Sequence, residues 1–176
     1  MSYVAVYAAA TPDTPNKVLT HFDDIVSTLA DHGVRFARWH PAPIEKGASD
    51  ADMIAAYQPQ IDALGYAAVE VLRAAGDPAQ NVELRAQFLS ERRYSEDAVH
   101  FFIAGQGQFN LHLGDYVYAV RCEKNDLLVI PAGVPHWFDM GENPHFVTLR
   151  LFNTAKGCEP QLTGDAIADG FPGLDD

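Results

Sequence analysis

Apolar and polar positions follow a helical spacing over much of the first ninety residues of this chain. Residues 23–32 place aliphatic side chains on one face and are followed by Gly33, a common helix-ending residue, so a helix is predicted there. The same spacing predicts further helices over residues 50–57, 61–75 and 82–89. Two short runs have the composition or alternation of β-strands instead, over residues 3–10 and 34–39.

After residue 90 the pattern changes to short alternating or apolar runs, separated by glycine, proline and asparagine. These runs predict strands over residues 98–103, 108–113, 116–121, 126–130, 136–140 and 146–152. Short strands with glycine turns are typical of an antiparallel sandwich or barrel. The tail is expected to be loop, with one short helix near residues 165–169. Since no stretch resembles a linker, we expect one domain of residues 1–176, with an N-terminal strand and helical layer (1–90), core barrel motifs (91–153) and a C-terminal tail (154–176).

The 176 residues carry 24 acidic and 12 basic side chains, a formal net charge of −12. So acidic a chain lacks the basic face that attracts nucleic acid or an anionic membrane surface, and we expect neither partner. Cys122 and Cys158 form no CxxC pair and are predicted to be free thiols in a reducing compartment. The opening apolar run is too short to span a bilayer, which favours a cytoplasmic protein. A small-molecule substrate is the expected partner, and no pattern specifies an oligomeric state.

The segment NDLLVIPAGVPHWFDM, from Asn125 to Met140, carries the clearest motif. A strand enters it, Pro131 and Gly133 form a turn, and His136 begins the next strand at the rim or interior of a small barrel. The segment resembles the second motif of the cupin superfamily. Together with the runs GDPAQNVELRAQFLSE, CEKND, WFDMGENPHF and LTGDAIA, it is similar to the acireductone dioxygenase family, in order from about residue 34 to residue 168.

That resemblance implies a mainly β fold, a cupin barrel (double-stranded β-helix or jelly roll) with N-terminal helices. It also implies the family activity, in which oxygen and an enediol give formate and a keto acid, or formate, carbon monoxide and a shorter acid, in methionine salvage. Members of the family hold one Fe(II) or Ni(II) on a His-x-His pair, a glutamate four residues later, and the histidine that corresponds to His136.

The first motif departs from the family at its ligand positions. The two histidine positions hold Arg92 and Tyr94, the glutamate position holds Ala98, and His100 replaces a family arginine near the substrate. Arginine has no lone pair to give, alanine has no donor atom, and a first-row metal needs several donors in a fixed geometry. We therefore expect a divergent member that has lost the metal site, with His136 as the only remaining ligand and no metal or other cofactor.

The polar side chains at these positions suggest chemistry without a metal. Arg92 would bind an anion and Tyr94 would donate a hydrogen bond to an enolate oxygen. His100 and His136 would transfer protons. The aromatic side chains expected to contact the substrate are Phe101 and Trp137. This set predicts a metal-independent isomerase, tautomerase or lyase that acts on a small anionic oxygenated metabolite.

Two alternatives remain open. In the first, Arg92 and Tyr94 only fill the vacated space, and the chain is a non-catalytic pseudoenzyme that binds a ligand or a partner. In the second, the chain is a genuine acireductone dioxygenase with a rebuilt metal site, in which His136 and His100 hold Fe(II), Ni(II) or Zn(II) weakly.

Two further polar residues near the altered motif are interpreted as structural. Glu91 directly precedes the motif, and an ion pair with Arg92 or Arg93 is expected. His112 alternates outward from an apolar strand and is expected on the surface.

Overall fold

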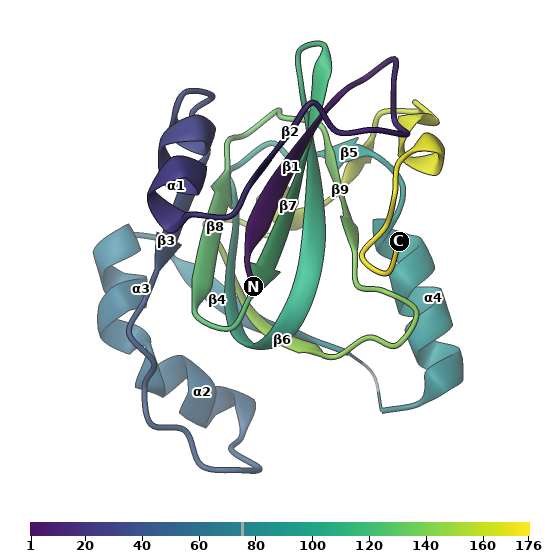
Figure 1. Ribbon diagram of the computed structural model, residues 1–176. Helices are drawn as coiled ribbons and strands as arrows, with labels where there is room; N and C mark the ends of the chain where they lie inside the picture. The colour runs from purple at the N-terminus through teal and green to yellow at the C-terminus, as the bar shows by residue number, and fades with distance from the viewer. Residues whose placement is uncertain (75) are drawn as a thin grey trace.

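The computed structural model of the chain describes residues 1–74 and 76–176. In this part of the chain, 11 strands form one hydrogen-bonded antiparallel sheet that curls into a barrel (Figure 1). The prediction of a mainly β, antiparallel barrel is confirmed. The strands are β1 (Tyr3–Ala8), β2 (Lys17–Leu19), β3 (Arg35–Arg38), β4 (Ala68–Arg73), β5 (Arg92–Arg93), β6 (Ala98–Leu113), β7 (Tyr116–Glu123), β8 (Asp126–Ile130), β9 (His136–Asp139), β10 (Phe146–Phe152) and β11 (Gln161–Leu162).

The barrel has two walls that share the long strand β6. One wall has the strand order β11-β5-β9-β6-β7-β1-β2, and the other has the order β4-β10-β6-β8-β3. Residues 98–105 of β6 pair within the second wall, and residues 106–113 pair within the first. Gly105 lies at this change of partner with a φ of 74°, and a Cβ there would overlap the backbone oxygen of His145. Glycine is therefore required where β6 passes from one wall to the other.

Helices pack on the outside of the barrel. Ser49 and Asp52 form a reciprocal capping box at the start of α2 (Asp50–Ala56), and Asp77 caps α4 (Pro78–Phe88). Figure 1 shows α2 and α3 on one side of the barrel and α4 on the opposite side, next to the C-terminal segment. The helices are α1 (Phe22–Ala30), α2 (Asp50–Ala56), α3 (Gln58–Leu64) and α4 (Pro78–Phe88).

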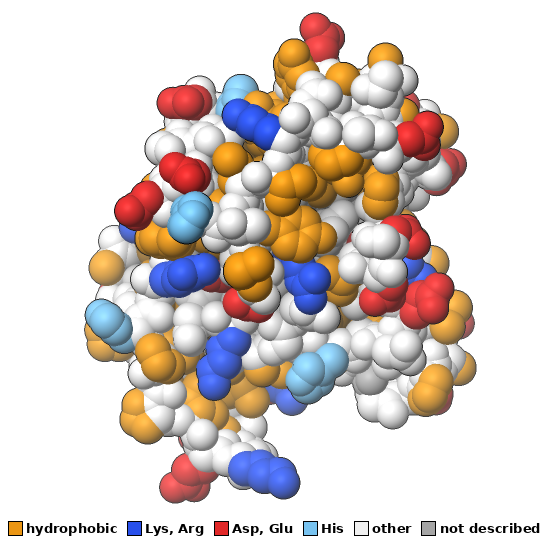
Figure 2. All heavy atoms as spheres, in the orientation of Figure 1, with side chains coloured by type: hydrophobic (Ala, Val, Ile, Leu, Met, Phe, Trp, Pro, Cys, Tyr) orange, Lys and Arg blue, Asp and Glu red, His pale blue; other side chains and the backbone are white. Residues whose placement is uncertain are grey.

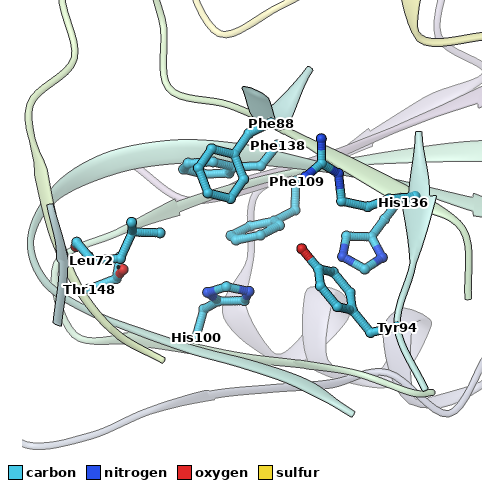
Figure 3. Close-up of a pocket in the computed structure, with 9 residues that line it drawn as sticks. Leu72, Phe88, Tyr94, His100, Phe109, His136, Phe138 and Thr148 are labelled. Carbon is cyan, nitrogen blue, oxygen red and sulfur yellow. Dashed lines mark hydrogen bonds between the residues drawn. The ribbon is translucent and has the colours of Figure 1, made fainter. Parts of the chain in front are cut away.

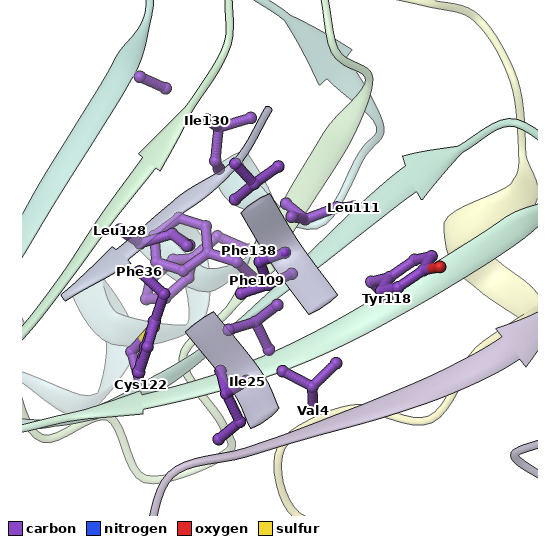
Figure 4. Close-up of a cluster of buried hydrophobic side chains, with 14 of the residues drawn as sticks. Val4, Ile25, Phe36, Phe109, Leu111, Tyr118, Cys122, Leu128, Ile130 and Phe138 are labelled. Atoms are coloured by element: carbon purple, nitrogen blue, oxygen red, sulfur yellow. The ribbon is translucent and has the colours of Figure 1, made fainter. Parts of the chain in front are cut away.

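Apolar side chains from both walls fill the inside of the barrel (Figure 4). Phe109 and Phe138 lie at its centre, with ring centroids 4.5 Å apart. A second apolar cluster, which includes Tyr57, Phe101 and Leu149, lies between helices α2 and α3 and the wall formed by β4 and β10. Each large apolar side chain that is fully buried stabilises the fold by about 1.5–3 kcal/mol, so the two clusters account for much of the driving force for folding.

The local structure differs from the sequence prediction at several places. The helix predicted over residues 61–75 ends at Leu64, residues 68–73 form strand β4, and Ala75 lies outside the described residues. Pairing with β10 overrides the helical spacing there. The strands predicted over residues 98–103 and 108–113 are one continuous strand, β6. The tail holds β11 and two short 3-10 helices, η1 (Lys156–Cys158) and η2 (Ile167–Gly170), and η2 lies near the predicted helix.

Across residues 1–74 and 76–176, no helix is both long and apolar enough to cross a membrane. Figure 2 shows Lys and Arg side chains standing apart on the viewed face, with acidic and apolar side chains between them. The absence of a nucleic-acid partner and a cytoplasmic location stay predictions.

Candidate active site

A small cavity lies inside the barrel, enclosed by side chains from both walls and from α4 (Figure 3). We call it the central cavity. Its volume is about 10 Å³, which is space for about one water molecule. The structure thus brings together the four polar positions that the sequence singled out. The lining residues are Leu72, Phe88, Arg92, Tyr94, His100, Phe109, His136, Phe138 and Thr148.

His136 is the first residue of β9 and is buried. Its Nδ1 lies 2.9 Å from the backbone oxygen of Val134, so Nδ1 carries the hydrogen and Nε2 keeps a lone pair. Burial lowers the pKa of His136 to about 4; the charges of Arg92 and Arg150 lower it further, and the hydrogen bond to Val134 opposes the decrease. The ring is therefore neutral near pH 7 and can accept a proton or coordinate a metal ion.

His100 comes from the other wall, on β6, and is also buried. Its ring centroid lies 4.7 Å from that of Phe109. Burial lowers the pKa of His100 well below its usual value, and the positive charges of Arg150 and of protonated His136 act in the same direction. The central cavity thus contains two imidazoles that are uncharged at neutral pH.

Tyr94 follows β5 and is buried beside His136, with the two ring centroids 5.5 Å apart. Figure 3 shows the hydroxyl of Tyr94 pointing toward the middle of the cavity. A phenol in this position can donate a hydrogen bond to an oxygen of a bound molecule.

Arg92 contributes a buried guanidinium to the cavity wall, but the protein itself uses much of its hydrogen-bonding capacity. Nε donates to the backbone oxygen of Ser90 at 3.1 Å, and a terminal nitrogen donates to the backbone oxygen of Gln87. The guanidinium carbon lies 5.4 Å from the ring centroid of Phe88. These contacts hold Arg92 against the C-terminal end of α4, whose last carbonyl groups have no partner within the helix.

Phe101 and Trp137, which were expected to contact the substrate, do not line the central cavity. Successive side chains of a strand leave opposite faces. Phe101 follows His100 and packs into the second apolar cluster. Trp137 follows His136 and lies near Phe171 of the C-terminal segment, with ring centroids 6.0 Å apart.

An open groove of about 460 Å³ adjoins the central cavity near the end of α4. Three side chains, those of Phe88, Arg92 and Tyr94, line both spaces and therefore separate them. Because the central cavity holds only about one water molecule, a substrate can reach the imidazoles only if this partition moves. The groove is lined by Gln87, Phe88, Arg92, Tyr94, Arg150, Cys158, Pro160 and Leu162.

A second cluster of titratable side chains joins Glu91, His112 and Asp165, whose ligand-type atoms all lie within 4.8 Å of one another. Oε2 of Glu91 lies 2.9 Å from Nδ1 of His112. The expected ion pair of Glu91 with Arg92 or Arg93 is therefore wrong, and His112 is half-buried beside Glu91 rather than free on the surface. Strand alternation could have indicated this contact. Glu91 precedes Arg92 and His112 follows Leu111, and because these two neighbours face inward, Glu91 and His112 both face outward.

The comparisons with known proteins agree with one another. The model of the ARD/ARD' family matches residues 4–160. The acireductone dioxygenase of Pseudomonas syringae pv. syringae (strain B728a) is 57% identical over 181 residues, which cover 100% of both chains. That of Stutzerimonas stutzeri (strain A1501) is 55% identical with the same coverage. A solved acireductone dioxygenase from Bacillus anthracis, with a cadmium ion in its active center, matches with a TM-score of 0.79 and 22% identity over 92% of this chain and 98% of that chain, which confirms the cupin fold.

These matches overturn two expectations. The metal-independent isomerase, tautomerase or lyase is wrong, because relatives aligned over the whole chain are acireductone dioxygenases by name. The expectation of no cofactor is wrong because this family consists of metal-dependent dioxygenases, and because the chain brings three metal-ligating side chains together at Glu91, His112 and Asp165. The non-catalytic alternative finds no support in the comparisons. The chain belongs to the ARD/ARD' family, the acireductone dioxygenases.

Proposed function

We propose that this chain is a metal-dependent acireductone dioxygenase, which uses oxygen to cleave a small enediol. The observation that carries the proposal is the 57% identity over the whole chain to a relative of that name. The family activity implies formate and a keto acid as products, or formate, carbon monoxide and a shorter acid, and a place in methionine salvage. The central cavity is the proposed substrate site.

Three side chains of the central cavity are proposed to contact the substrate. The hydroxyl groups of an enediol need acceptors, and the uncharged imidazoles of His100 and His136 supply lone pairs. An enediolate oxygen needs a donor, and the hydroxyl of Tyr94 can supply one. The buried guanidinium of Arg92 adds positive charge beside that oxygen.

The donor set of the central cavity does not by itself match a first-row metal ion. Such an ion takes three or more protein donors in a fixed geometry. The cavity offers the two imidazoles and the phenol of Tyr94, with the guanidinium of Arg92 next to them. Ala98, at the family glutamate position, has no donor atom and lies in the apolar core. The proposal therefore places no ion on the first-motif positions and assigns no reaction step to an ion in this cavity.

A single domain of residues 1–176 is part of the proposal. Strands β1, β3 and β4 come from the first ninety residues, yet they pair with β7, β8 and β10 of the barrel. This pairing supports one folding unit in which the N-terminal layer helps to shape the site.

Activity assays on metal-loaded protein test the proposal. The purified chain is stripped with a chelator, reloaded with Fe²⁺ or with Ni²⁺ under anaerobic conditions, and mixed with an acireductone and oxygen. We expect the enediol absorbance to fall together with oxygen uptake and formate release. His136→Ala should abolish the reaction, and Phe101→Leu, which lies outside the cavity, should retain it. Loss of enediol at the uncatalysed rate with both metals would contradict the proposal.

A further inference from the structure

Three side chains with metal-ligating atoms meet on the outer face of the barrel wall. They are Glu91, His112 and Asp165, which we call the outer triad. They come from separate segments: the residue before β5, strand β6, and the turn after β11. One ligand-type atom from each residue lies within 4.8 Å of the other two.

The barrel wall separates the outer triad from the central cavity. Glu91 directly precedes Arg92, which lines the cavity. His112 follows Leu111, which is fully buried in the barrel core and pairs with His136. Because successive side chains of a strand leave opposite faces, the outer triad faces away from the cavity and cannot touch a molecule bound there.

The carboxylate of Glu91 is only 2% exposed. Its Oε1 accepts a hydrogen bond from Oγ1 of Thr163 at 2.7 Å, and its Oε2 lies 2.9 Å from Nδ1 of His112. Among the described residues, no Lys or Arg nitrogen lies within ion-pair distance of this carboxylate. Buried carboxylates are normally matched by a charged partner or a metal ion, and this one has only an imidazole.

The contact between Glu91 and His112 needs either a hydrogen or a metal ion between the two atoms. A carboxylate oxygen and an unprotonated imidazole nitrogen are both electron-pair donors, and at 2.9 Å they repel unless a proton or a metal ion lies between them. The third member, Asp165, brings another carboxylate to the same place. Two carboxylates and a neutral imidazole carry a formal charge of −2, which a divalent cation balances and a single proton does not.

Local hydrogen bonds hold Asp165 in position. Its Oδ1 accepts from the backbone nitrogen of Ile167 at 3.0 Å, and its own backbone nitrogen donates to Oγ1 of Thr163 at 3.2 Å. Thr163 is the same residue that donates to Glu91, so one turn orients both carboxylates. Asp165 is exposed, and water can therefore complete a coordination shell on that side.

We propose that the outer triad binds one divalent cation of the zinc class. His112 supplies a nitrogen ligand, and Glu91 and Asp165 supply oxygen ligands, a donor set that Zn²⁺ accepts. Bound there, the ion joins β5, β6 and the turn that contains Thr163. It clamps the C-terminal segment onto the barrel, on the opposite side of the wall from the proposed substrate site.

Metal titration of the full chain tests this site. After treatment with a chelator, the protein is titrated with Zn²⁺ by calorimetry and with Co²⁺ by visible absorption. We expect a saturable equivalent at the outer triad, a rise in Tm with Zn²⁺, and a loss of affinity of at least about tenfold for that equivalent in both His112→Gln and Asp165→Asn. Asp169→Asn, an exposed acidic residue of the same segment, is the matched control and should bind as the parent chain does.

A cavity variant locates the ion. His136→Gln should bind Co²⁺ as the parent chain does. If this variant instead loses Co²⁺ binding while His112→Gln retains it, the ion lies in the central cavity and the proposal is overturned. If the parent chain shows no saturable metal binding, the Glu91–His112 contact is an ordinary hydrogen bond, and the proposal is also overturned. Asp165 is exposed, so its variant keeps the test valid if His112→Gln does not fold. Binding is measured without substrate or oxygen, so this result is separate from the test of dioxygenase activity.

Discussion

The guanidinium of Arg85 lies against the carboxylate of Asp139, with Nε 2.8 Å from Oδ1, and this pair joins helix α4 to strand β9. Asp139 is buried and also accepts hydrogen bonds from the backbone nitrogens of Gly141 and Leu174. Helix α4 ends at Phe88, which covers the central cavity, and β9 begins at His136. The ion pair therefore fixes the cover of the cavity to the strand that carries one of its imidazoles.

Replacing Arg85 with methionine should lower the free energy of unfolding by about 2 kcal/mol, because it leaves a buried carboxylate without its cation. Urea denaturation measures the change. The exposed Arg93 makes no ion pair within the described chain, so Arg93→Met should stay within about 0.5 kcal/mol of the parent protein. Equal losses in the two variants would show that the pair does not stabilise the fold.

Stability should fall as the pH decreases from 6.5 to about 4, because His136 has an ordinary pKa of 6.5 when unfolded and one of about 4 when folded. Between these values the unfolded chain binds a proton that the folded chain does not. The contribution of His136 to the free energy of unfolding has its full value above pH 6.5. By about pH 4, proton binding to the unfolded His136 has lowered it by about 3 kcal/mol.

Urea denaturation at pH 7.5 and pH 4.5, on the parent chain and on His136→Gln, checks this linkage. The variant should lose less stability over the interval, and His100 should account for a remaining decrease because its pKa is also lowered by burial. An identical decrease in both proteins would mean that His136 titrates normally in the fold.

Gly105→Ala should destabilise the protein severely or prevent folding. An alanine there meets both an unfavourable positive φ and the backbone of His145. Gly133 has a φ of 83° but no atom within 4 Å of an added Cβ. Gly133→Ala should therefore cost only the backbone strain, about 1–2 kcal/mol. Thermal unfolding of the two variants should separate these effects, and similar Tm values would contradict the bend assigned to β6.

Phe109→Leu and Phe101→Leu should destabilise the fold to a similar extent, by about 1–2 kcal/mol, since both rings are buried and the same volume is removed. Of these two residues, Phe109 lines the central cavity and Phe101 does not. We expect Phe109→Leu to change KM for the acireductone and Phe101→Leu to leave it near the parent value. A larger effect on KM at position 101 would place the substrate in the second apolar cluster.

The short runs after residue 90 predicted an antiparallel sandwich or barrel, and the resemblance to the family indicated that Tyr94, His100 and His136 share one site, a placement with which strand alternation agrees. Applied consistently, it also places Phe101 and Trp137 on the opposite faces; these two were assigned to the substrate because they are aromatic neighbours of the histidines. Strand β4 could not be predicted from local pattern. Its sequence AVEVLR contains good helix formers, and its pairing with β10 decides its conformation.

The outer triad was missed for a different physical reason. Glu91 and His112 are 21 residues apart, and Asp165 lies in a tail that returns to the barrel through the pairing of β11 with β5. No spacing along the sequence indicates that the tail folds back onto β5. The expectation that no metal binds rested on the substituted positions 92, 94 and 98, and the sequence pattern indicated no third protein ligand beside His100 and His136.

The pairing of β1 with β7, β3 with β8, and β4 with β10 has a consequence for biosynthesis. As the chain leaves the ribosome, strands β1, β3 and β4 emerge long before these partners have been translated, and the edges that wait for them stay available to other nascent chains. Cellular yield should therefore depend on chaperones that shield those edges during translation more than on the stability of the finished barrel.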